Sequence, residues 1–390
     1  MEGERVWMDE RHGTFDELDT ARRLAEAVRV CQPQIYDARE LPSSLVAQLT
    51  EGGLFRLLLP THLGGSQLPL PKFIRCVEAI AHADGSAGWC VGQGGVFPNV
   101  ADGMPAETAN EIWGVNPTAV VATGTPFGST ALRVDDVYRL SGRWRFASGC
   151  LHASWLAAMS PIVNDIGKTV GFGMFLVPRE AISLGDGWNV RGLRGTGSRE
   201  YTLDNLEVPI ARALIGNVFK DHCGAATGLP AQLLFASAFG SVGLGIARRA
   251  LDELMSLIEG KTPIFTNRKL LDDDLVHMGL AQAEATWGMS RAFLHDIAHA
   301  CEFEHQTHGA PSGKLRTHLR LAATNAMRQA GAVVDQAYEL AGSDVVFEDH
   351  PIHRCFQDIH ALTQQLQGRR AHFRTVGRVL LGLDPDNAVL

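Results

Sequence analysis

The feature that most constrains the fold is a hydrophobic period that changes twice along the chain. Apolar residues such as Leu18, Ala21, Leu24 and Val28 recur about every 3.6 positions in the first part, which is typical of helices. From about Thr118 they alternate instead, as strands require, and beyond about Asp221 the helical period returns. The order helix, strand, helix predicts a mainly α protein with a central β domain.

Local signals predict where the elements begin and end. One helix is expected from Pro42 to Glu51, stopped by Gly52 and Gly53, and another from Pro71 to Ala83. Alternation is clearest in 138–146, where Tyr138, Leu140, Trp144 and Phe146 are the apolar positions. Further strands are expected at 118–122, 155–163, 171–177 and 201–208, forming an antiparallel barrel or sandwich.

Four long stretches with the helical period follow, and they predict a C-terminal four-helix bundle. They cover 226–259, 272–301, 314–341 and 356–381. The expected domains are therefore an N-terminal helical domain (1–116), a β-barrel domain (117–220) and the bundle (221–390). A chain of 390 residues is long enough for this division.

Composition excludes several classes of protein. The net charge is −8 and no basic block occurs, which disfavours nucleic-acid binding. The seven cysteines are scattered without zinc spacing, so we expect reduced thiols, a cytoplasmic location and no metal. The N-terminal sequence lacks the features of an export signal. The uncharged segment 225–247 is long enough to cross a bilayer, but Pro230, Gln232 and several glycines favour a buried helix.

Common catalytic motifs fail in context. The glycines at 243 and 245 lie in a helical stretch with no preceding strand, so no dinucleotide-binding domain is implied. The segment 124–129 lacks the lysine of a phosphate loop, and neither a G-x-S-x-G nor an H-E-x-x-H motif occurs. Hydrolase and ATPase functions are therefore disfavoured.

Five segments remain, and together they resemble the acyl-CoA dehydrogenase superfold over nearly the whole chain. The resemblance is stronger to its flavin-dependent monooxygenase branch, the oxygenase components of two-component aromatic hydroxylases. The segments are S-A-G-W at Ser86–Trp89, F-A-S-G with a following H-A-S-W at Phe146–Trp155, G-T-G-S before a strand at Gly195–Pro209, G-I-A-R-R-A-L-D at Gly245–Asp252, and R-C-F-Q-D-I-H-A-L-T-Q at Arg354–Gln364.

The resemblance implies a homotetramer that binds reduced FAD or FMN between the β domain and the bundle. A separate flavin reductase would supply the flavin by diffusion, and dioxygen would react with it to form a flavin hydroperoxide. The residues that the resemblance assigns to the cofactor are Trp144, Ser148, Gly149, Thr196, Ser198, Arg354 and Asp358. Trp89 and Phe97 would line an apolar substrate pocket together with Gln365.

The same fold also carries dehydrogenases, which need a carboxylate base beside the substrate. In the dehydrogenase pattern this base is a Glu before a Gly, and the matching stretch here is Gln365-Leu366-Gln367-Gly368. A dehydrogenase or oxidase with tightly bound FAD is thus the second interpretation. A homologue that only binds a ligand, without catalysis, is the third.

Gln365 also bears on the substrate. Phenol-hydroxylating relatives carry a His at this position, seven residues after the aspartate that corresponds to Asp358. Seven residues are about two helical turns, so the two side chains would lie on one face of a helix. Glutamine cannot take a proton, so the sequence favours an indole-type ring, which is nucleophilic without losing one, over a phenol. The expected reaction is hydroxylation or epoxidation of an aromatic or heteroaromatic molecule. For proton transfer we prefer His152, next to Ser148, over His360.

Overall fold

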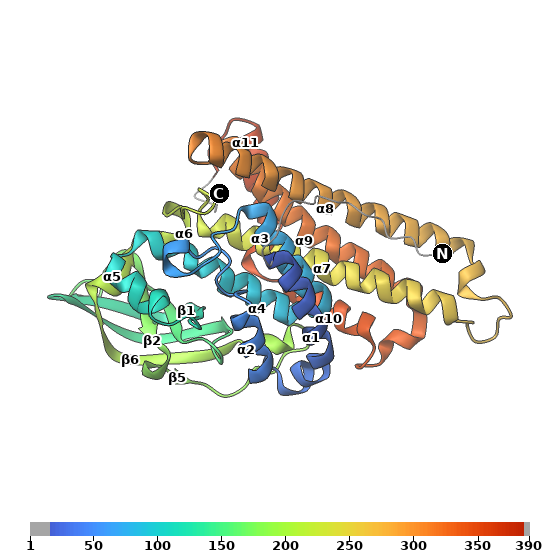
Figure 1. Cartoon of the computed structure of the whole chain (residues 1–390), viewed down its shortest axis with the longest axis horizontal. Helices are drawn as coiled ribbons and strands as arrows, with labels where there is room; N and C mark the ends of the chain where they lie inside the picture. Colours follow the sequence, from blue (N-terminus) through green and yellow to red (C-terminus); the bar gives the residue numbers. More distant parts are fainter. Residues whose placement is uncertain (1–15, 386–390) are drawn as a thin grey trace.

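The computed structural model describes residues 16–385, and it has the predicted order of helices, sheet and helices (Figure 1). Residues 1–15, on which the expectation about export rests, lie outside the described part. The N-terminal block contains α1 (Glu17–Ala38), α2 (Ser43–Glu51), α3 (Leu70–Ala83), α4 (Gly85–Val96) and α5 (Ala106–Ala109), with short helical turns at Thr61–Leu63, Phe97–Gly103 and Asn110–Gly114.

The central block is one seven-stranded sheet in the order β5-β6-β2-β1-β3-β4-β7. The prediction of a purely antiparallel sheet was wrong in one place, because β1 and β3 pair in parallel. Two short strands, β5 and β7, were not predicted, and β1 extends well beyond residue 122. The strands are β1 (Val121–Val134), β2 (Val137–Ser148), β3 (Trp155–Val163), β4 (Thr169–Pro178), β5 (Ser183–Leu184), β6 (Arg199–Pro209) and β7 (Ala213–Ile215).

A bulge near the end of β2 changes which side chains face the core. The register with β6 shifts between Trp144 and Ala147, and Phe146 has a left-handed φ of 58°. An extra residue in one strand reverses the alternation beyond it. Trp144 therefore faces the interior, whereas Phe146 is 62% exposed.

The C-terminal block contains α6 (Val218–Asp221), α7 (Ala231–Gly260), α8 (Asp274–His308), α9 (Gly313–Ala341), α10 (Pro351–Thr363) and α11 (Ala371–Leu380). The fourth predicted stretch is not one helix. It is interrupted by the turn Leu366–Gly368, where the Gln365 side chain accepts a hydrogen bond from the Gln367 amide at 2.6 Å. A side chain that caps the following turn ends the preceding helix.

Helix α7 is the one helix among residues 16–385 that is long and apolar enough to cross a membrane, and it is almost entirely buried inside the protein. It packs against α3, α4, α9 and α10, and it runs through the middle of the bundle in Figure 1. This burial identifies α7 as a core helix, as the sequence predicted.

Helix α4 lies between the sheet and α7, and all of its residues from Gly85 to Val96 are buried. Asp84 caps its first turn by accepting a hydrogen bond from the Ala87 amide at 2.9 Å. Ser86, Trp89 and Gln93 are spaced three and four residues apart, so they share one face of this helix.

Candidate functional site

Three hydroxyl groups form a connected row where β2 ends. The Ser148 Oγ lies 2.6 Å from the Ser198 Oγ, which lies 2.7 Å from the Thr196 Oγ1. The Thr196 hydroxyl donates to the Leu193 carbonyl at 2.8 Å. The sequence motifs A-S-G and G-T-G-S, fifty residues apart, are thus brought into direct contact, and we call this group the hydroxyl corner.

Backbone contacts hold the hydroxyl corner in place. The Gly149 amide donates to the Thr196 carbonyl at 2.9 Å, and the Gln93 side chain donates to the Ser148 carbonyl at 2.9 Å. The Gly195 amide donates to the Ser86 hydroxyl at 3.0 Å. Gly149 has a φ of 76°, a conformation that favours glycine, and a Cβ there would lie 3.1 Å from His152.

Two aromatic rings border the corner on its outer side. Phe146 is exposed, and its ring meets that of Trp188 edge to face, with centroids 6.2 Å apart. The Trp188 indole N–H donates to the Leu193 carbonyl at 3.2 Å, the same carbonyl that receives the Thr196 hydroxyl. Accessible aromatic side chains next to hydroxyl groups that can form further hydrogen bonds are typical of a ligand site.

Trp144, which the resemblance assigns to the cofactor, faces the interior of the sheet, and its contact with the cofactor stays a prediction. Trp144 is fully buried in the core of the β sheet, where its ring stacks on Tyr201 at 5.1 Å. Its N–H donates to the Met159 carbonyl at 2.7 Å. The bulge after Trp144 is the physical reason, because it turns Trp144 inward and Phe146 outward.

His152 lies directly behind the corner. Its Nε2 is buried without a hydrogen-bond partner among residues 16–385, and its ring lies 5.6 Å from that of Phe55. Burial lowers the pKa of His152 to about 4. The side chain is therefore a neutral imidazole near neutral pH, with one unpaired ring nitrogen.

Trp89 and Phe97 belong to one buried aromatic cluster that also includes Phe219, Phe235 and Phe239. Trp89 stacks on Phe239 at 3.9 Å, and Phe97 meets Phe235 at 5.5 Å. Phe235 also contacts Phe239 and Phe219. Helix α4 connects this cluster to the hydroxyl corner, because Trp89 lies on the face that carries Ser86 and Gln93.

Polar atoms beside the aromatic cluster have no protein partner. The Trp89 N–H and both polar atoms of the Asn99 amide are buried without a hydrogen bond to any described residue. Buried polar groups are normally paired, so unpaired ones mark places where a ligand or water completes the structure.

Arg354 and Asp358 lie in a second polar group, between α1, α4, α10 and the turn at Arg194–Thr196. They line a cavity of about 10 Å³, room for about one water, together with Asp84, Ser86, Arg194 and Tyr36. Arg354 stacks on the Tyr36 ring at 4.8 Å. Asp358 accepts a hydrogen bond from the Leu193 amide at 2.5 Å, which connects this group to the hydroxyl corner.

Asp358 and Asp84 are both buried carboxyl groups at this cavity. Burial and the neighbouring charge of Asp84 raise the pKa of Asp358 to about 8. Burial likewise raises the pKa of Asp84, against the opposing hydrogen bonds at the start of α4. The raised pKa favours the protonated form of the Asp358 carboxyl near neutral pH.

Gln365 lies at the end of α10, where it caps the next turn rather than extending as a free side chain. Gln367 accepts a hydrogen bond at 2.5 Å from Arg320, a guanidinium with no exposed surface. Burial lowers the pKa of Arg320 to about 9. The position where dehydrogenases carry their base therefore holds neutral amides next to a buried cation.

The other histidines take part in ordinary pairs. His360 lies at the surface, 2.8 Å from Asp335. His295 contacts Glu78 at 3.0 Å, and His299 lies 3.8 Å from Glu302. Within residues 16–385 no three potential metal ligands lie together.

Sequence reasoning missed Ser86, Gln93, Asn99 and Arg320 as site residues. A signal existed for the first two, because Ser86 and Gln93 are the polar side chains of a helix otherwise made of glycine and apolar residues. Asn99 lies in the short turn after Pro98 and Arg320 in the predicted helix 314–341, and in neither place does the local sequence indicate a buried polar side chain.

Comparisons with known proteins agree with this geometry. Residues 237–367 match the family model described as acyl-CoA dehydrogenase, C-terminal domain. The chain is 29% identical to the indole-3-acetate monooxygenase of Pseudomonas putida, over 89% of both chains. It is 28% identical to the oxygenase subunit HsaA of a flavin-dependent monooxygenase from Mycobacterium tuberculosis, over 90% of this chain and 88% of that one.

A solved structure shares the whole fold. XiaF from a Streptomyces species, in complex with FADH2 and glycerol, superposes with a TM-score of 0.89 at 21% identity, covering 96% of this chain and 97% of that one. The predicted acyl-CoA dehydrogenase-like architecture is confirmed.

Proposed function

We propose that this chain, which belongs to the oxygenase components of two-component flavin-dependent monooxygenases, inserts oxygen into an indole-type heteroaromatic ring at the aromatic cluster beside the hydroxyl corner. The observation that carries the proposal is the connection made by α4. Its Ser86 and Gln93 hold the corner, and Trp89, between them, belongs to the aromatic cluster. Flavin and substrate sites thus meet at one helix.

The residues at the corner fit a reduced flavin. Ser148 offers a hydroxyl at the sheet edge, Gly149 supplies the left-handed turn that packs against His152, and Phe146 and Trp188 offer aromatic surfaces. Thr196 and Ser198 are joined to Ser148 by hydrogen bonds. Bound reduced FAD or FMN would supply the electrons that activate dioxygen for insertion of one oxygen atom.

The chain's own residues would bind and orient the substrate. Trp89, Phe97, Phe235 and Phe239 form an apolar wall that excludes water, which protects reactive oxygen species from side reactions. The Trp89 N–H is available to donate a hydrogen bond to an acceptor group of the substrate, such as the carboxylate of indole-3-acetate.

The proton chemistry favours indole over phenol. Gln365 and Gln367 cannot accept a proton, and His152, with its pKa near 4, is a weak base. An indole ring reacts at carbon as a neutral nucleophile. The same neutral amides disfavour a dehydrogenase, which requires a carboxylate at this place.

The test is turnover with a supplied reductase. Purified protein with a flavin reductase, NADH and FAD or FMN should convert indole or indole-3-acetate to an oxygenated product detected by mass spectrometry. Simple phenols should give mainly hydrogen peroxide. Peroxide alone from every indole, or bleaching of bound flavin by an acyl-CoA without reductase, would contradict the proposal.

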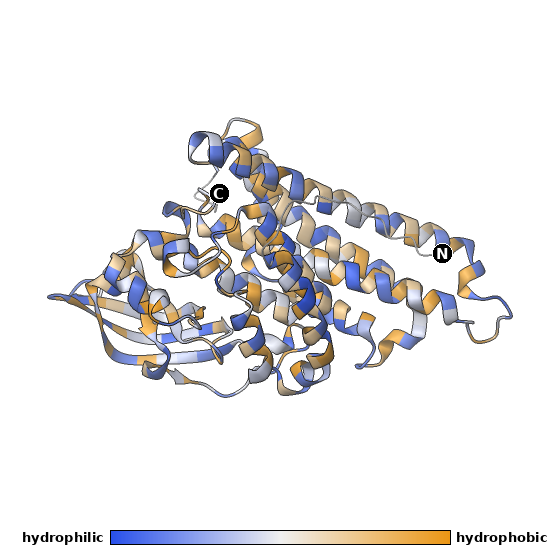
Figure 2. Ribbon diagram, in the orientation of Figure 1, coloured by the Kyte–Doolittle hydropathy of each residue, from blue (hydrophilic) through white to orange (hydrophobic). Residues whose placement is uncertain are grey.

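As an oxygenase component the protein depends on a separate reductase, and we further propose a homotetramer in the cytoplasm. Helix α8 supports self-association. Leu275, Met289 and Phe303 are exposed and spaced fourteen residues apart, and exposed Met278 follows Leu275 by three residues, so the four side chains share one face of this outer helix. Hydrophobic and hydrophilic residues are mixed along α8 in Figure 2. All seven cysteines are free thiols, which suits a reducing compartment.

Self-association is tested by Met289→Glu. A charge at the centre of the exposed α8 face should shift the sedimentation coefficient to that of a smaller species. Glu302→Gln, on the same helix, is a control for the change of charge and should leave the assembly unchanged.

A further inference from the structure

Arg320 of α9 is a buried cation without a counterion. Its side chain has no exposed surface, and within residues 16–385 no carboxylate contacts its guanidinium. Burial is the cause that lowers its pKa to about 9, whereas a neighbouring carboxylate would raise the pKa. The guanidinium is still charged near neutral pH. Buried charges are normally paired, so an unpaired one marks a place where an anion would bind.

The hydrogen bonds of Arg320 compensate for only part of its burial. Its Nη1 donates to the Gln367 side-chain oxygen at 2.5 Å, and its Nη2 donates to the Gln232 carbonyl at 3.2 Å. Both acceptors are neutral. The Nε–H is buried and has no partner among the described residues. One donor of the guanidinium is therefore open, and its positive charge is uncompensated.

A second open donor lies one helical turn along α9. Thr324 is four residues after Arg320, so the two side chains share one face of the helix. The Thr324 hydroxyl is fully buried, and no described residue forms a hydrogen bond with it. Thr317, another buried threonine of α9, instead donates to the Gly313 carbonyl of its own helix at 2.8 Å. Thr324 therefore keeps a hydroxyl available on the side of the cation.

The histidine nearest to this cation is neutral as well. The Nε2 of His372, on α11, lies 2.9 Å from the Leu366 carbonyl. Burial and the charge of Arg320 lower the pKa of His372, so its imidazole is uncharged near neutral pH. Arg320, Thr324, Gln367 and His372 thus form a buried, positively charged group, which we call the cation site.

The cation site lies next to the proposed substrate site. Gln232, whose carbonyl receives Arg320, precedes Phe235 by three residues and Phe239 by seven, so the three residues follow one another along one side of α7. The rise of a helix places Phe235 about 5 Å and Phe239 about 10 Å along the axis from Gln232. Both phenylalanines belong to the aromatic cluster. An indole ring with a short acidic side chain can span this distance.

We propose that Arg320 and Thr324 bind the carboxylate of an aromatic acid whose ring lies against the aromatic cluster, which makes Arg320 a specificity-determining residue. A carboxylate can accept hydrogen bonds from the Arg320 Nε–H and the Thr324 hydroxyl while it neutralises the guanidinium. The Trp89 N–H, a neutral donor, cannot compensate for the charge of such a substrate. This inference rests on the proposed function and narrows its substrate class to arylacetic acids such as indole-3-acetate.

The experiment compares indole-3-acetate with indole-3-acetamide, which has nearly the same size but no charge. Dissociation constants are measured by anaerobic calorimetry with reduced flavin present, and kcat/KM by product formation with a flavin reductase. The wild type should prefer the acid at least about tenfold. In Arg320→Gln this preference should fall about tenfold, while turnover of the amide stays within about threefold of wild type and shows that the variant is folded.

Two further variants make smaller changes at the same site. Arg320→Lys keeps the charge and should keep part of the preference for the acid. Thr324→Val removes only the open hydroxyl and should lower the preference about threefold. Because valine and threonine have nearly the same shape, Thr324→Val tests the inference even where Arg320→Gln does not fold.

The matched control is Arg316→Gln. Arg316 also lies on α9, one turn earlier, and it donates to the backbone carbonyls of Pro311 at 3.0 Å and Gly228 at 3.3 Å. Its loss removes the same charge from the same helix and should leave the preference for the acid unchanged.

The outcomes separate the inference from the proposed function. Equal affinity of the wild type for the acid and the amide would overturn the inference, and so would an unchanged preference in folded Arg320→Gln and Thr324→Val. Binding of the acid that depends on Arg320, but without any oxygenated product, would support the cation site and overturn the proposed function.

Discussion

Helix α7 packs against two tryptophans, Trp287 and Trp89, and they differ in the hydrogen bonding of their indole N–H groups. Trp287 of α8 donates its N–H to the Leu244 carbonyl at 3.0 Å and lies against Arg248 and Arg291. Trp89 of α4 stacks on Phe239, but its N–H has no partner among the described residues. The Trp287 N–H is therefore paired within the protein, whereas the Trp89 N–H is still able to donate a hydrogen bond.

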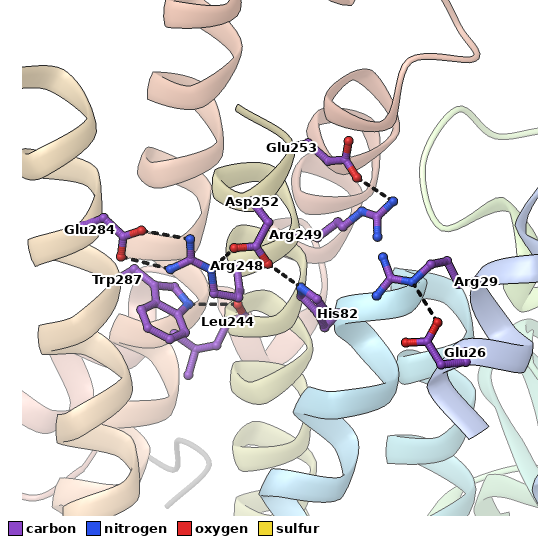
Figure 3. Close-up of polar contacts among 10 residues, drawn as sticks. All are labelled: Glu26, Arg29, His82, Leu244, Arg248, Arg249, Asp252, Glu253, Glu284 and Trp287. Atoms are coloured by element: carbon purple, nitrogen blue, oxygen red, sulfur yellow. Dashed lines mark hydrogen bonds and ion pairs between the residues drawn. The ribbon is translucent and has the colours of Figure 1, made fainter. Parts of the chain in front are cut away.

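The surroundings of the two rings repeat the contrast. Beside Trp287, Arg248 pairs with both oxygens of Glu284 at 2.8 and 2.9 Å and with Asp252, which also contacts His82 at 2.7 Å (Figure 3). This paired set joins α3, α7 and α8, and we call it the charge network. Beside Trp89 the rings of Phe239 and Phe235 offer no hydrogen-bond partner, so the indole N–H stays unpaired. Polar groups of the first region hold helices together, whereas those of the second are available to a ligand.

The largest expected effect is on stability, from Arg248→Met. Removing the guanidinium breaks both of its hydrogen bonds to Glu284 and leaves Asp252 with His82 alone. Because both carboxylates are more than a third exposed, water screens part of the loss, and we expect the free energy of unfolding to fall by about 1–3 kcal/mol. Denaturant titration measures it.

Flavin binding by folded Arg248→Met should stay at the wild-type level, since the charge network has no part in the corner. The control Arg22→Met removes an exposed pair with Asp19 and should cost little. A loss of flavin affinity without a loss of stability would break the contrast between the two regions.

The next effect is on catalysis, from Trp89→Phe. The phenyl ring keeps the stack on Phe239 but removes the open N–H, so kcat/KM for an indole-type substrate should fall about tenfold. Trp287→Phe is the matched control on the other side of α7 and should leave kcat/KM unchanged. Equal effects of the two substitutions would remove the distinction drawn between the rings.

The third prediction concerns pH and compares Asp358 with Asp252. The folded-state pKa of Asp358 is about 8, above its unfolded value near 3.8, so its contribution is fully present at low pH and is lost as the pH rises toward 8. The stability of Asp358→Asn relative to wild type should therefore increase steadily as the pH rises from 5 to 8.

Asp252 has the opposite sign. Burial alone would raise its pKa, but the hydrogen bond to His82 and the charge of Arg248 outweigh burial and lower it. Its contribution is present above about pH 4 and is lost at lower pH. Thermal melts of Asp358→Asn and Asp252→Asn across pH 3–9 would show both trends, and parallel curves would contradict them.

The smallest effect is expected from Phe146→Ala. The ring is exposed, so stability should change by less than about 0.5 kcal/mol. Flavin affinity should fall about threefold, since an aromatic surface beside the corner is lost. Fluorescence titration measures the affinity, and Phe127→Ala, another exposed ring of the sheet, is the control that should bind flavin normally.

The sequence predicted those parts of the fold that local patterns determine. The bounds of α2 and β3 agree with the expected 42–51 and 155–163 within a residue, because a glycine pair and regular alternation mark them. The opposite orientation of Trp144, which faces the core, and Phe146, which faces solvent, was not predictable. It depends on the bulge, which forms where β2 pairs with β6, some fifty residues later. The proximity of Ser148 and Ser198 was implied only by the family resemblance.

The proximity of Asp84 and Asp358 was likewise not predictable from the sequence. Asp84 reads as the cap of a helix and Asp358 as part of a motif, and nothing local indicates that they share one cavity. Their shifted pKa values come from contacts between residues far apart in sequence, which periodicity does not report.

Helix α4, buried along its whole length, touches both sites through one face. Under the proposed function, a substrate bound at Trp89 would be coupled through α4 to Gln93 and hence to the backbone of Ser148. Coupled binding affinities are reciprocal. If the bound aromatic substrate changes the affinity for flavin by some factor, bound flavin changes the affinity for the substrate by the same factor. The affinity of the enzyme for reduced flavin would then depend on whether the aromatic substrate is bound.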